Sequence, residues 1–137
     1  MKGDHLPPHD HVSRYCGGKH IAENGRPLAT AFRHRPNEEF LSVNWLESLH
    51  QNDRESQIRE VRQRLDLVLG ATAKIAVLNV GETCEDVERA GFKIGILHEP
   101  KARDSSHSGF FGILQDELKI SLLIAEKVLE VYPAREP

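Results

Sequence analysis

The segment Lys74–Pro100 limits the fold more than any other part of the chain, because two of its apolar runs are separated by a short polar stretch. The first run, Ile75–Val80, is short and rich in β-branched residues, which is typical of a mostly buried strand. Gly81 is expected to end this strand. Thr83 is then placed to cap a helix, and Gly91 is the residue at which that helix should stop.

A second strand is predicted over the other apolar run, Phe92–Leu97. If it lay parallel to Lys74–Val80 and beside it, only about eleven residues would connect the two, which is at the lower limit for a crossover. A parallel pair therefore requires short or offset strands, and a mixed sheet fits the sequence equally well.

Local patterns elsewhere predict three more strands and two helices. The strands are His11–Cys16, Phe40–Trp45 and Gly109–Leu114. The first helix, Arg54–Leu69, follows a cap at Asn52-Asp53 and has one apolar stripe, formed by Ile58, Val61, Leu65 and Val68. In the second helix, Asp116–Val131, one face carries Leu118, Leu122, Ala125 and Leu129, and it is widened by Ile120, Leu123, Ile124 and Val128. This second helix is therefore expected to be well buried.

These elements predict a single domain over residues 1–137, of the α+β or α/β class. It should contain one mixed β-sheet of about four to five strands, packed by two main helices. Residues 1–10 and 134–137 are expected to be irregular or mobile, because they are polar, rich in proline and close to the chain ends.

Charge and hydropathy argue against several functional classes. The net charge is −3, which disfavours general nucleic-acid binding. No run of about 18 apolar residues is present, so no membrane-spanning helix is expected. The first ten residues lack the apolar centre of a signal peptide, and the two cysteines, far apart in the sequence, are expected to stay reduced. The chain is accordingly predicted to be cytoplasmic.

Arg14, Ser42 and His107 are the candidate catalytic residues. Arg14 and Ser42 are polar residues within segments that otherwise resemble core strands, so each needs a partner. Arg14 should either pair with an acid such as Glu47 or Glu82, or hold a ligand's phosphate bidentately. His107 lies among small hydroxyl residues before an apolar run, where it could serve as a general base or donate to a phosphate or sugar oxygen.

Ser105, Ser106 and Ser108 surround that histidine and are candidate ligand-binding residues. The plainer interpretation is that these serines satisfy the backbone of their own loop and that His107 is hydrogen-bonded structure. Successive strand residues point to opposite faces, so a serine adjacent to His107 does not form a hydrolase pair with it. The chain also has no GxSxG motif.

His9, His11 and Cys16 form a candidate zinc set near the N-terminus. Two histidines separated by one residue would lie on the same face of an extended strand, and imidazole and thiolate are common zinc ligands. The spacing matches none of the usual structural zinc patterns, and a proline-rich segment can carry histidines that have no role.

The Arg/Glu-rich helix 54–69 is a candidate partner-binding face. Arg54, Arg59, Arg62 and Arg64 lie largely off its apolar stripe, interspersed with acidic residues. Such a pattern usually belongs to a solvated helix stabilised by charge pairs three and four residues apart. A phosphate-binding or protein-binding face is the sharper alternative.

Several phrases of the sequence resemble a family of small, uncharacterised bacterial proteins. They are Arg14-Tyr15, Ala31-Phe32, Leu41–Glu47, Gly81-Glu82 with Cys84, Ala90-Gly91 and His107, which together extend over most of residues 11–114. Around the histidine the family pattern has a proline and an alanine, where this chain has serines. The resemblance implies a bacterial cytoplasmic protein and supplies no reaction or cofactor.

Three functional hypotheses follow. The leading one is an accessory or protein-interaction module, because no strong catalytic motif is present and helix 54–69 is available to a partner. The alternative is a ligand-binding or enzymatic domain for a phosphorylated or nucleotide-like small molecule, with an ADP-ribosyltransferase-like use of Arg14, Ser42 and His107 as an analogy. The third is zinc binding by the histidine-rich N-terminal region.

Overall fold

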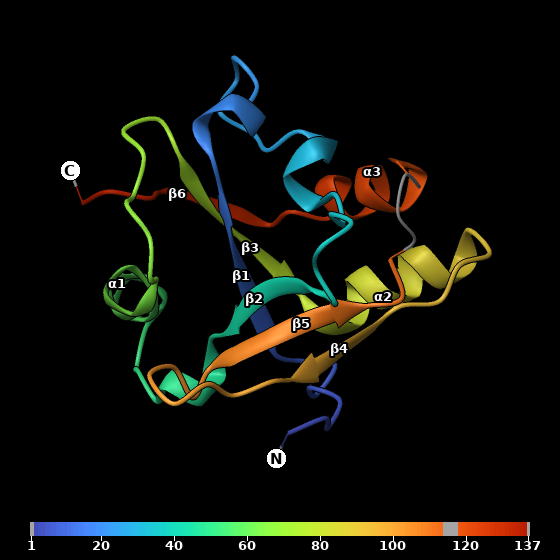
Figure 1. Ribbon diagram of the computed structural model, residues 1–137, viewed down its shortest axis with the longest axis horizontal. Coiled ribbons are helices and arrows are strands. Elements are labelled where there is room, and N and C mark those ends of the chain that lie inside the picture. The colour runs from blue at the N-terminus through green and yellow to red at the C-terminus, as the bar shows by residue number, and fades with distance from the viewer. Residues whose placement is uncertain (1, 114–117, 137) are drawn as a thin grey trace.

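Within residues 2–113 and 118–136, which the computed structural model describes, six strands form one sheet. They are β1 (His11–Cys16), β2 (Leu41–Trp45), β3 (Lys74–Asn79), β4 (Gly95–His98), β5 (His107–Phe111) and β6 (Glu130–Pro133), in the spatial order β4-β5-β2-β1-β3-β6 (Figure 1). Every neighbouring pair is antiparallel. The class is therefore α+β, and the expected mixed sheet of four to five strands is wrong.

The two strands that flank the predicted capped helix are not neighbours. Three strands separate β3 from β4, which lies at the edge of the sheet. A short crossover cannot return the chain beside β3, and the intervening helix leads instead to the far edge of the sheet (Figure 1). Gly91 ends that helix as predicted, with a φ of +94°. β4 then begins at Gly95, three residues later than the predicted start at Phe92.

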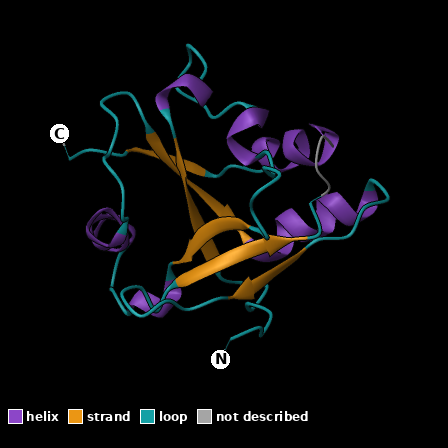
Figure 2. Cartoon of the chain, in the orientation of Figure 1, coloured by secondary structure: helices purple, strands orange, loops and turns teal. Residues whose placement is uncertain are grey.

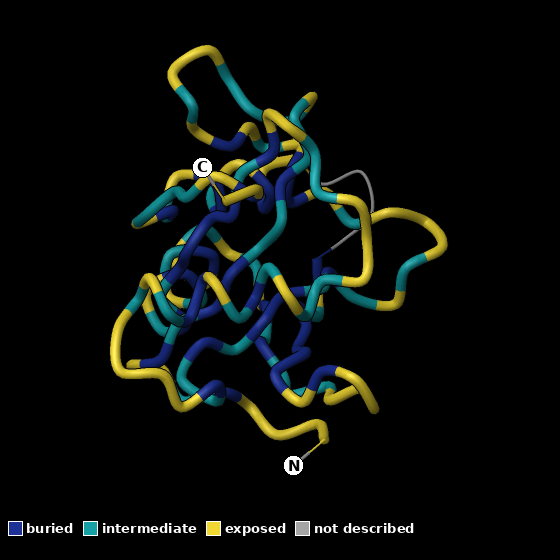
Figure 3. The backbone as a smooth tube through the Cα atoms, turned by 90° about the vertical axis from the view of Figure 1, so that its left-hand side faces the viewer, coloured by how far each residue is buried: buried dark blue, intermediate teal, exposed yellow. Residues whose placement is uncertain are grey.

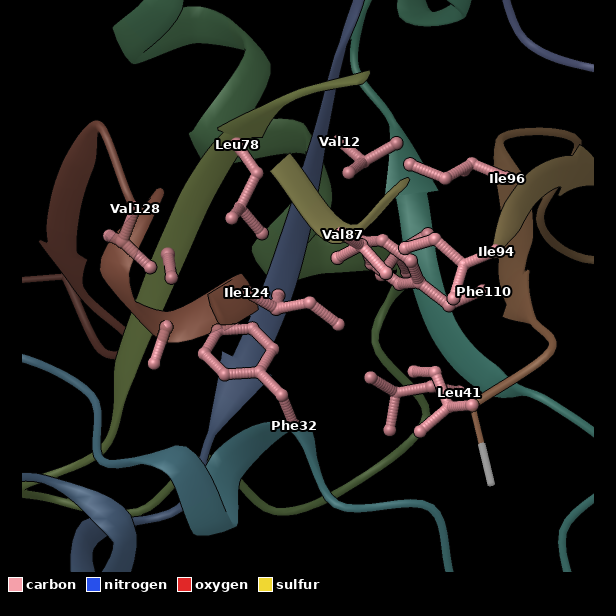
Figure 4. Close-up of a cluster of buried hydrophobic side chains, with 14 of the residues drawn as sticks. Val12, Phe32, Leu41, Leu78, Val87, Ile94, Ile96, Phe110, Ile124 and Val128 are labelled. Atoms are coloured by element: carbon pink, nitrogen blue, oxygen red, sulfur yellow. The ribbon is translucent and has the colours of Figure 1, made fainter. Parts of the chain in front are cut away.

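Three α-helices lie in the described parts of the chain: α1 (Arg54–Arg64), α2 (Val80–Arg89) and α3 (Leu118–Glu126). Short 3-10 helices occupy Gly18–His20, Ala29–Phe32 and Glu47–Leu49 (Figure 2). The larger core includes Phe32, Leu41, Leu78, Val87 and Ile124, contributed by the sheet, α2, α3 and the turn at Ala29–Phe32 (Figure 4). A smaller core under α1 includes Ile58, Val61, Ile75 and Val77. The buried residues lie mainly in the middle of the molecule, and the exposed ones lie mainly in its outer loops (Figure 3). None of the described helices is long and apolar enough to cross a membrane.

α2 begins earlier than its sequence suggests. Its N-cap is Asn79 instead of Thr83, and the Asn79 Oδ1 accepts the Glu82 N–H at 2.8 Å. The Thr83 hydroxyl instead donates to the Asn79 carbonyl at 2.7 Å. Gly81 does not separate strand from helix; it lies in the first turn, where a Cβ would come within 2.8 Å of the Pro8 carbonyl oxygen. Close approach of the N-terminal segment is what requires glycine there.

α1 ends at Arg64, five residues before the predicted Leu69. Asp53 caps it as expected, accepting the Ser56 N–H at 2.8 Å. The helix does not continue beyond Arg64: Leu65 has an extended backbone, and Val68, predicted to lie on the buried stripe, is 89% exposed. Only Ile58 and Val61 of the predicted apolar stripe are buried in the smaller core, because the chain after Arg64 leaves the helix and leads to the start of β3.

α3 buries a different face from the one that its leucines define. Leu118 and Leu122 are about half exposed, whereas Ile120 and Ile124 are fully buried. Ser121 on the buried side donates to the Phe32 carbonyl at 3.0 Å, which joins α3 to the turn before β2. Both faces are apolar enough to be buried, so the packing partner decides which one is.

The predicted last helix also ends early, and its final residues form β6. α3 stops at Glu126, and Glu130–Pro133 pair with β3. The predicted helix start at Asp116 and the predicted strand end at Leu114 lie outside the described residues. Ala134, placed in a fraying tail by the sequence, is fully buried.

Residues 2–10 contain no helix or long strand, but they are attached to the sheet. The Gly3 N–H donates to the His98 carbonyl at 2.7 Å, and His5 forms an isolated bridge with Leu97. Leu6 is buried in the larger core. The segment therefore covers the exposed edge of β4.

β1 and β2 separate after a short contact, and this separation opens a cavity between them. Only two residue pairs, Val12 with Trp45 and Ser13 with Asn44, join them, whereas β1 pairs with β3 along all six of its residues. From Arg14 onward, β1 and β2 diverge. Side chains can therefore occupy the space that a continued ladder would close.

Candidate functional site

A cavity of about 1000 Å³ opens where β1 and β2 separate. Its walls come from both strands, from His107 at the start of β5, from the turn before β2, from the segment after α1 and from residues 101–104. Six basic residues line it against three acidic ones: Arg14, Lys19, Arg35, Arg64, Lys101 and Arg103 against Glu38, Asp66 and Asp104. The cavity is therefore net positive, although the whole chain has a net charge of −3.

His20, which also lines the cavity, responds to this positive charge. Its pKa is lowered first by burial, and then by the charges of Arg35, Lys19 and Arg14. An imidazole surrounded by cations is harder to protonate. The same positive charges would attract an anionic ligand.

Arg14 lies half-buried in the gap between β1 and β2. Its Nε donates to the Ala31 carbonyl at 3.1 Å, and its Nη1 donates to the Ser42 carbonyl at 2.9 Å. No carboxylate of the described residues forms an ion pair with Arg14, and Glu47, one of the expected partners, binds His11 instead.

The guanidinium of Arg14 is therefore a charge in a partly desolvated position without a counter-charge in hydrogen-bonding contact. Burial lowers the pKa of Arg14, and the charges of Cys16 and Glu38 only partly oppose that shift. An arginine remains cationic at neutral pH, and its Nη2 donates to no described residue. Buried charges in proteins are normally paired, so this arrangement indicates a place for an anion.

Ser42 and His107 contact each other across β2 and β5. His107 Nε2 lies 3.1 Å from Ser42 Oγ, and His107 Nδ1 lies 2.8 Å from the Glu99 carbonyl oxygen. A carbonyl oxygen can only accept, so Nδ1 carries the proton and Nε2 of the neutral ring accepts from the Ser42 hydroxyl. Arg14, Ser42 and His107, the three candidate residues from the sequence, all line this one cavity, and no sequence pattern indicated the direct Ser42–His107 contact.

His107 is kept neutral by its surroundings. Only 6% of the residue is exposed, and the Phe40 ring lies beside it with 5.6 Å between ring centroids. Gly109, opposite Ser42 in the ladder, leaves the space that the Phe40 ring occupies, because a Cβ there would overlap the ring. Burial lowers the pKa of His107, and the hydrogen bond to the Glu99 carbonyl only partly opposes that shift.

A buried polar network adjoins this pair. Asn44 Nδ2 donates to Asp104 Oδ2 at 2.6 Å and to Ser106 Oγ at 2.8 Å, and Ser106 Oγ donates to Asp104 Oδ1 at 2.6 Å. Arg64 at the end of α1 reaches Asp104 Oδ1 at 3.3 Å. The network fixes the loop before β5, and with it the position of His107. Sequence reasoning missed Asn44 and Asp104, whose only signal was a polar residue in an apolar strand or in a charged segment, and it assigned Arg64 to a partner-binding helix face instead of to this network.

The three serines around His107 are not part of the cavity lining. Ser106 belongs to the buried network, Ser108 Oγ donates to the Ser106 carbonyl at 3.1 Å, and Ser105 is an exposed neighbour of Arg64. Ser106 and Ser108 are thus hydrogen-bonded within their own loop, whereas Ser105 accepts from Arg64.

The candidate zinc residues are not brought together. His11 lies at the start of β1, where its Nδ1 is 2.8 Å from Glu47 Oε2, and Cys16 is buried at the other end of the same strand. The His9 side chain is largely exposed beside Asp10. No group of three metal-capable side chains occurs in residues 2–113 or 118–136.

Comparisons with known proteins add no relative. No protein-family model matches the chain, and neither the curated proteins nor the solved structures contain a match. The functional argument therefore depends on the geometry of the cavity.

Proposed function

We propose that the protein binds a phosphorylated or nucleotide-like small molecule in the cavity between β1 and β2, with Arg14 as the anchor for its phosphate. The observation that carries the proposal is Arg14 itself, a partly buried guanidinium that has no carboxylate partner in residues 2–113 or 118–136 and keeps donors that bind none of these residues. A phosphate would supply both the missing charge and the missing acceptors.

The size and charge of the cavity support the same ligand class. Its volume of about 1000 Å³ lies at the upper end of the range for small-molecule sites. The excess of basic over acidic lining residues favours an anion over a neutral compound. A dinucleotide held in an ADP-ribosyltransferase-like manner is one form of this ligand, so NAD belongs among the compounds to be tried.

A protein-interaction role for α1 (Arg54–Arg64), predicted from the sequence as helix 54–69, has less support. The arginines that motivated it are used inside the molecule: Arg54 pairs with Glu130 at 3.1 Å, and Arg62 donates to the Pro133 carbonyl at 2.8 Å. Arg64 pairs with Glu60 and Asp104. These contacts connect α1 with β6 and with the loop before β5, and they leave little of its basic charge for a partner.

The test is a thermal-shift screen with inorganic phosphate, ribose 5-phosphate, AMP, ADP and NAD, with adenosine and ribose as uncharged controls. A ligand at 100 times its dissociation constant adds about 2.7 kcal/mol, which raises Tm by on the order of 10 °C in a domain of this size. Affinity should fall as KCl rises, because salt screens the attraction.

The matched variants are Arg14→Gln and Arg89→Gln. Arg89 is an exposed arginine on α2 that pairs with Glu85 and Asp86. We expect Arg14→Gln to lose at least tenfold in affinity for the phosphorylated compounds, since one charge-assisted bond is worth about 1.5–3 kcal/mol, and Arg89→Gln to bind normally. Equal stabilisation of both variants, or equal stabilisation by adenosine and AMP, would reject the proposal.

A further inference from the structure

The Ser42–His107 contact has features that anion binding alone does not need. Ser42 is half-buried and lines the cavity, so its hydroxyl can be reached by a bound molecule. His107 is almost completely buried, and its far nitrogen is held by the Glu99 carbonyl. A hydroxyl that donates to a neutral imidazole, which is itself oriented by a third group, is the arrangement of an activated nucleophile.

The anion anchor lies next to the same residue. Arg14 Nη1 donates to the backbone carbonyl of Ser42 at 2.9 Å, and both residues line the cavity. A phosphate held by the free donors of Arg14 would therefore lie beside Ser42 Oγ. In that position, Arg14 would also stabilise the negative charge of a phosphoryl group during transfer.

The surroundings of His107 suit it to be a base. Phe40 packs against its ring, and Ser42 is the only side chain of the described residues to which its Nε2 is hydrogen-bonded. Because Nδ1–H is committed to the Glu99 carbonyl, Nε2 has a lone pair directed to the serine. No carboxylate is hydrogen-bonded to the ring among the described residues, so the tautomer is set by the backbone.

We propose that Ser42 is the nucleophile of a phosphoryl-transfer reaction, with His107 as its base and Arg14 holding the phosphate ester. The substrate class, a phosphate monoester of a small molecule, rests on the proposed function. The nucleophile itself does not, because the serine and histidine can be tested with a neutral reagent.

The reaction balances without a further reactant except water. Ser42 Oγ bonds to phosphorus as the bond from phosphorus to the ester oxygen breaks, and the serine proton moves to His107 Nε2. The departing ester oxygen lies on the far side of phosphorus from Ser42, so it takes a proton from water and leaves as an alcohol. Water then attacks the phosphoserine from that side and loses a proton to solvent, while the His107 imidazolium returns its proton to Ser42 Oγ as inorganic phosphate departs.

The first experiment treats the protein with a neutral fluorophosphonate and locates the adduct by mass spectrometry. In this reaction Ser42 Oγ bonds to phosphorus, fluoride leaves and His107 takes the proton. We expect a single adduct at Ser42, none in Ser42→Ala, and at least 100-fold slower labelling in His107→Gln, because general-base catalysis contributes about 10²–10⁴-fold. Ser56→Ala, on α1, is the control and should label like the wild type.

Labelling of a different serine would overturn the assignment of Ser42 as the nucleophile. Equal labelling rates in wild type and His107→Gln would overturn the assignment of His107 as its base. Circular dichroism and Trp45 fluorescence show whether each variant is folded. Should His107→Gln be unfolded, the pH dependence of wild-type labelling decides: the rate should hold below the ordinary imidazole pKa of about 6.5 and fall only at lower pH. A rate that instead follows serine ionisation, and rises without limit above pH 8, would overturn the role of His107.

The second experiment uses 4-nitrophenyl phosphate as substrate and measures release of 4-nitrophenol. Release that is lost in Ser42→Ala and reduced in Arg14→Gln supports the reaction. No release by wild-type protein that labels at Ser42 would overturn the phosphoryl assignment. If phosphate and nucleotides fail to stabilise a protein that still labels at Ser42, the proposed function fails alone. If they stabilise it and Ser42 does not label, the nucleophile fails alone.

Discussion

Arg14 and His107 are held in the charge states that the cavity needs by the same physical cause, removal from water. Burial lowers the pKa of both. For the guanidinium the shift leaves the charge intact, and carbonyl dipoles from Ala31 and Ser42 partly replace its hydration. For the imidazole the same effect favours the neutral form. One residue can thus attract an anion while the other accepts a proton.

The low pKa of His107 should make the protein less stable in mild acid. Well above the ordinary imidazole pKa of about 6.5 the ring is neutral in both the folded and the unfolded state, so it adds no pH dependence there. As pH falls below 6.5, the unfolded chain takes up a proton that the folded site resists, and the free energy of unfolding drops by at most about 1.4 kcal/mol per pH unit.

Urea unfolding of wild type and His107→Gln between pH 7.5 and pH 5 measures this contribution. The wild type should lose more of its free energy of unfolding over this interval than the variant does. Parallel pH dependences in the two proteins would contradict it.

The two cysteines should be poor nucleophiles in the folded protein. Burial raises the pKa of Cys16 to about 12 and that of Cys84 to about 11. Because thiolate is the reactive form, at pH 8 a disulfide reagent such as Ellman's should modify Cys84 slowly and Cys16 only on unfolding. Cys84→Ala isolates the signal of Cys16, and modification of native Cys84→Ala at the rate of a free thiol would disprove the expectation.

At the scale of elements, helix boundaries depend on which side chain reaches the first free N–H groups. Asn79 does so for α2, and its Nδ2 also donates to the Asp10 carbonyl at 3.3 Å. Thr83 satisfies the sequence rule for a cap equally well, but it lies inside the helix with its hydroxyl bonded to the preceding turn. The local sequence is compatible with either Asn79 or Thr83 as the N-cap. The helix begins at the earlier position, where Gly81 lets the N-terminal segment pack against its first turn.

Replacing Asn79 with alanine should therefore destabilise the protein by about 1–2 kcal/mol, through loss of the cap. Asn79→Asp keeps the acceptor for the Glu82 N–H and should recover most of this loss. Urea unfolding curves give the comparison, with the exposed Asn37→Ala as the control. A larger effect for Asp than for alanine would exclude capping as the cause.

Sequence patterns also did not reveal how the strands of the sheet pair. Strands were predicted at five of the six positions, because short apolar runs are a local signal. β6 was hidden within the predicted last helix, and the order of strands was left open. Pairing joins residues far apart in the chain, such as Leu41 with Phe110, so no local window contains it.

For the molecule as a whole, the C-terminal strand closes one edge of the sheet. β6 pairs with β3 from Val77 to Lys74, and Ala134 completes the smaller core beneath α1. Arg54 and Arg62 of α1 also bind this segment. The last residues of the chain thus connect the central strands with the helix that borders the cavity.

A chain ending at Val128 should consequently fail to unfold cooperatively. Loss of β6 would expose the hydrogen-bonding edge of β3 and uncover Ile75 and Val77, which are fully buried. A chain ending at Arg135 is the control, because it keeps β6 and Ala134 and loses, of the described residues, only Glu136 with its ion pairs to Arg59 and Arg62. Calorimetry and size-exclusion chromatography should show a normal transition for the control and aggregation or no transition for the shorter chain. Native-like melting of the shorter chain would disprove this.

The sequence by itself determined where most strands and helices lie and which polar residues were out of place in them. Arg14 and Ser42 were notable because polar side chains are unusual in a buried strand. His107 was notable because it lies directly before an apolar run. These features can be predicted from short stretches of sequence, because they depend only on the spacing of apolar residues and on the chemistry of single side chains.

Only the tertiary structure decided that these three residues meet. β1 and β2 separate after two residue pairs, Arg14 occupies the opening, and the register of β2 with β5 places His107 against Ser42. The choice of buried face on α3 and the early end of α1 were settled in the same way. Each depends on contacts between distant segments, whose free energy exists only when the whole sheet has formed.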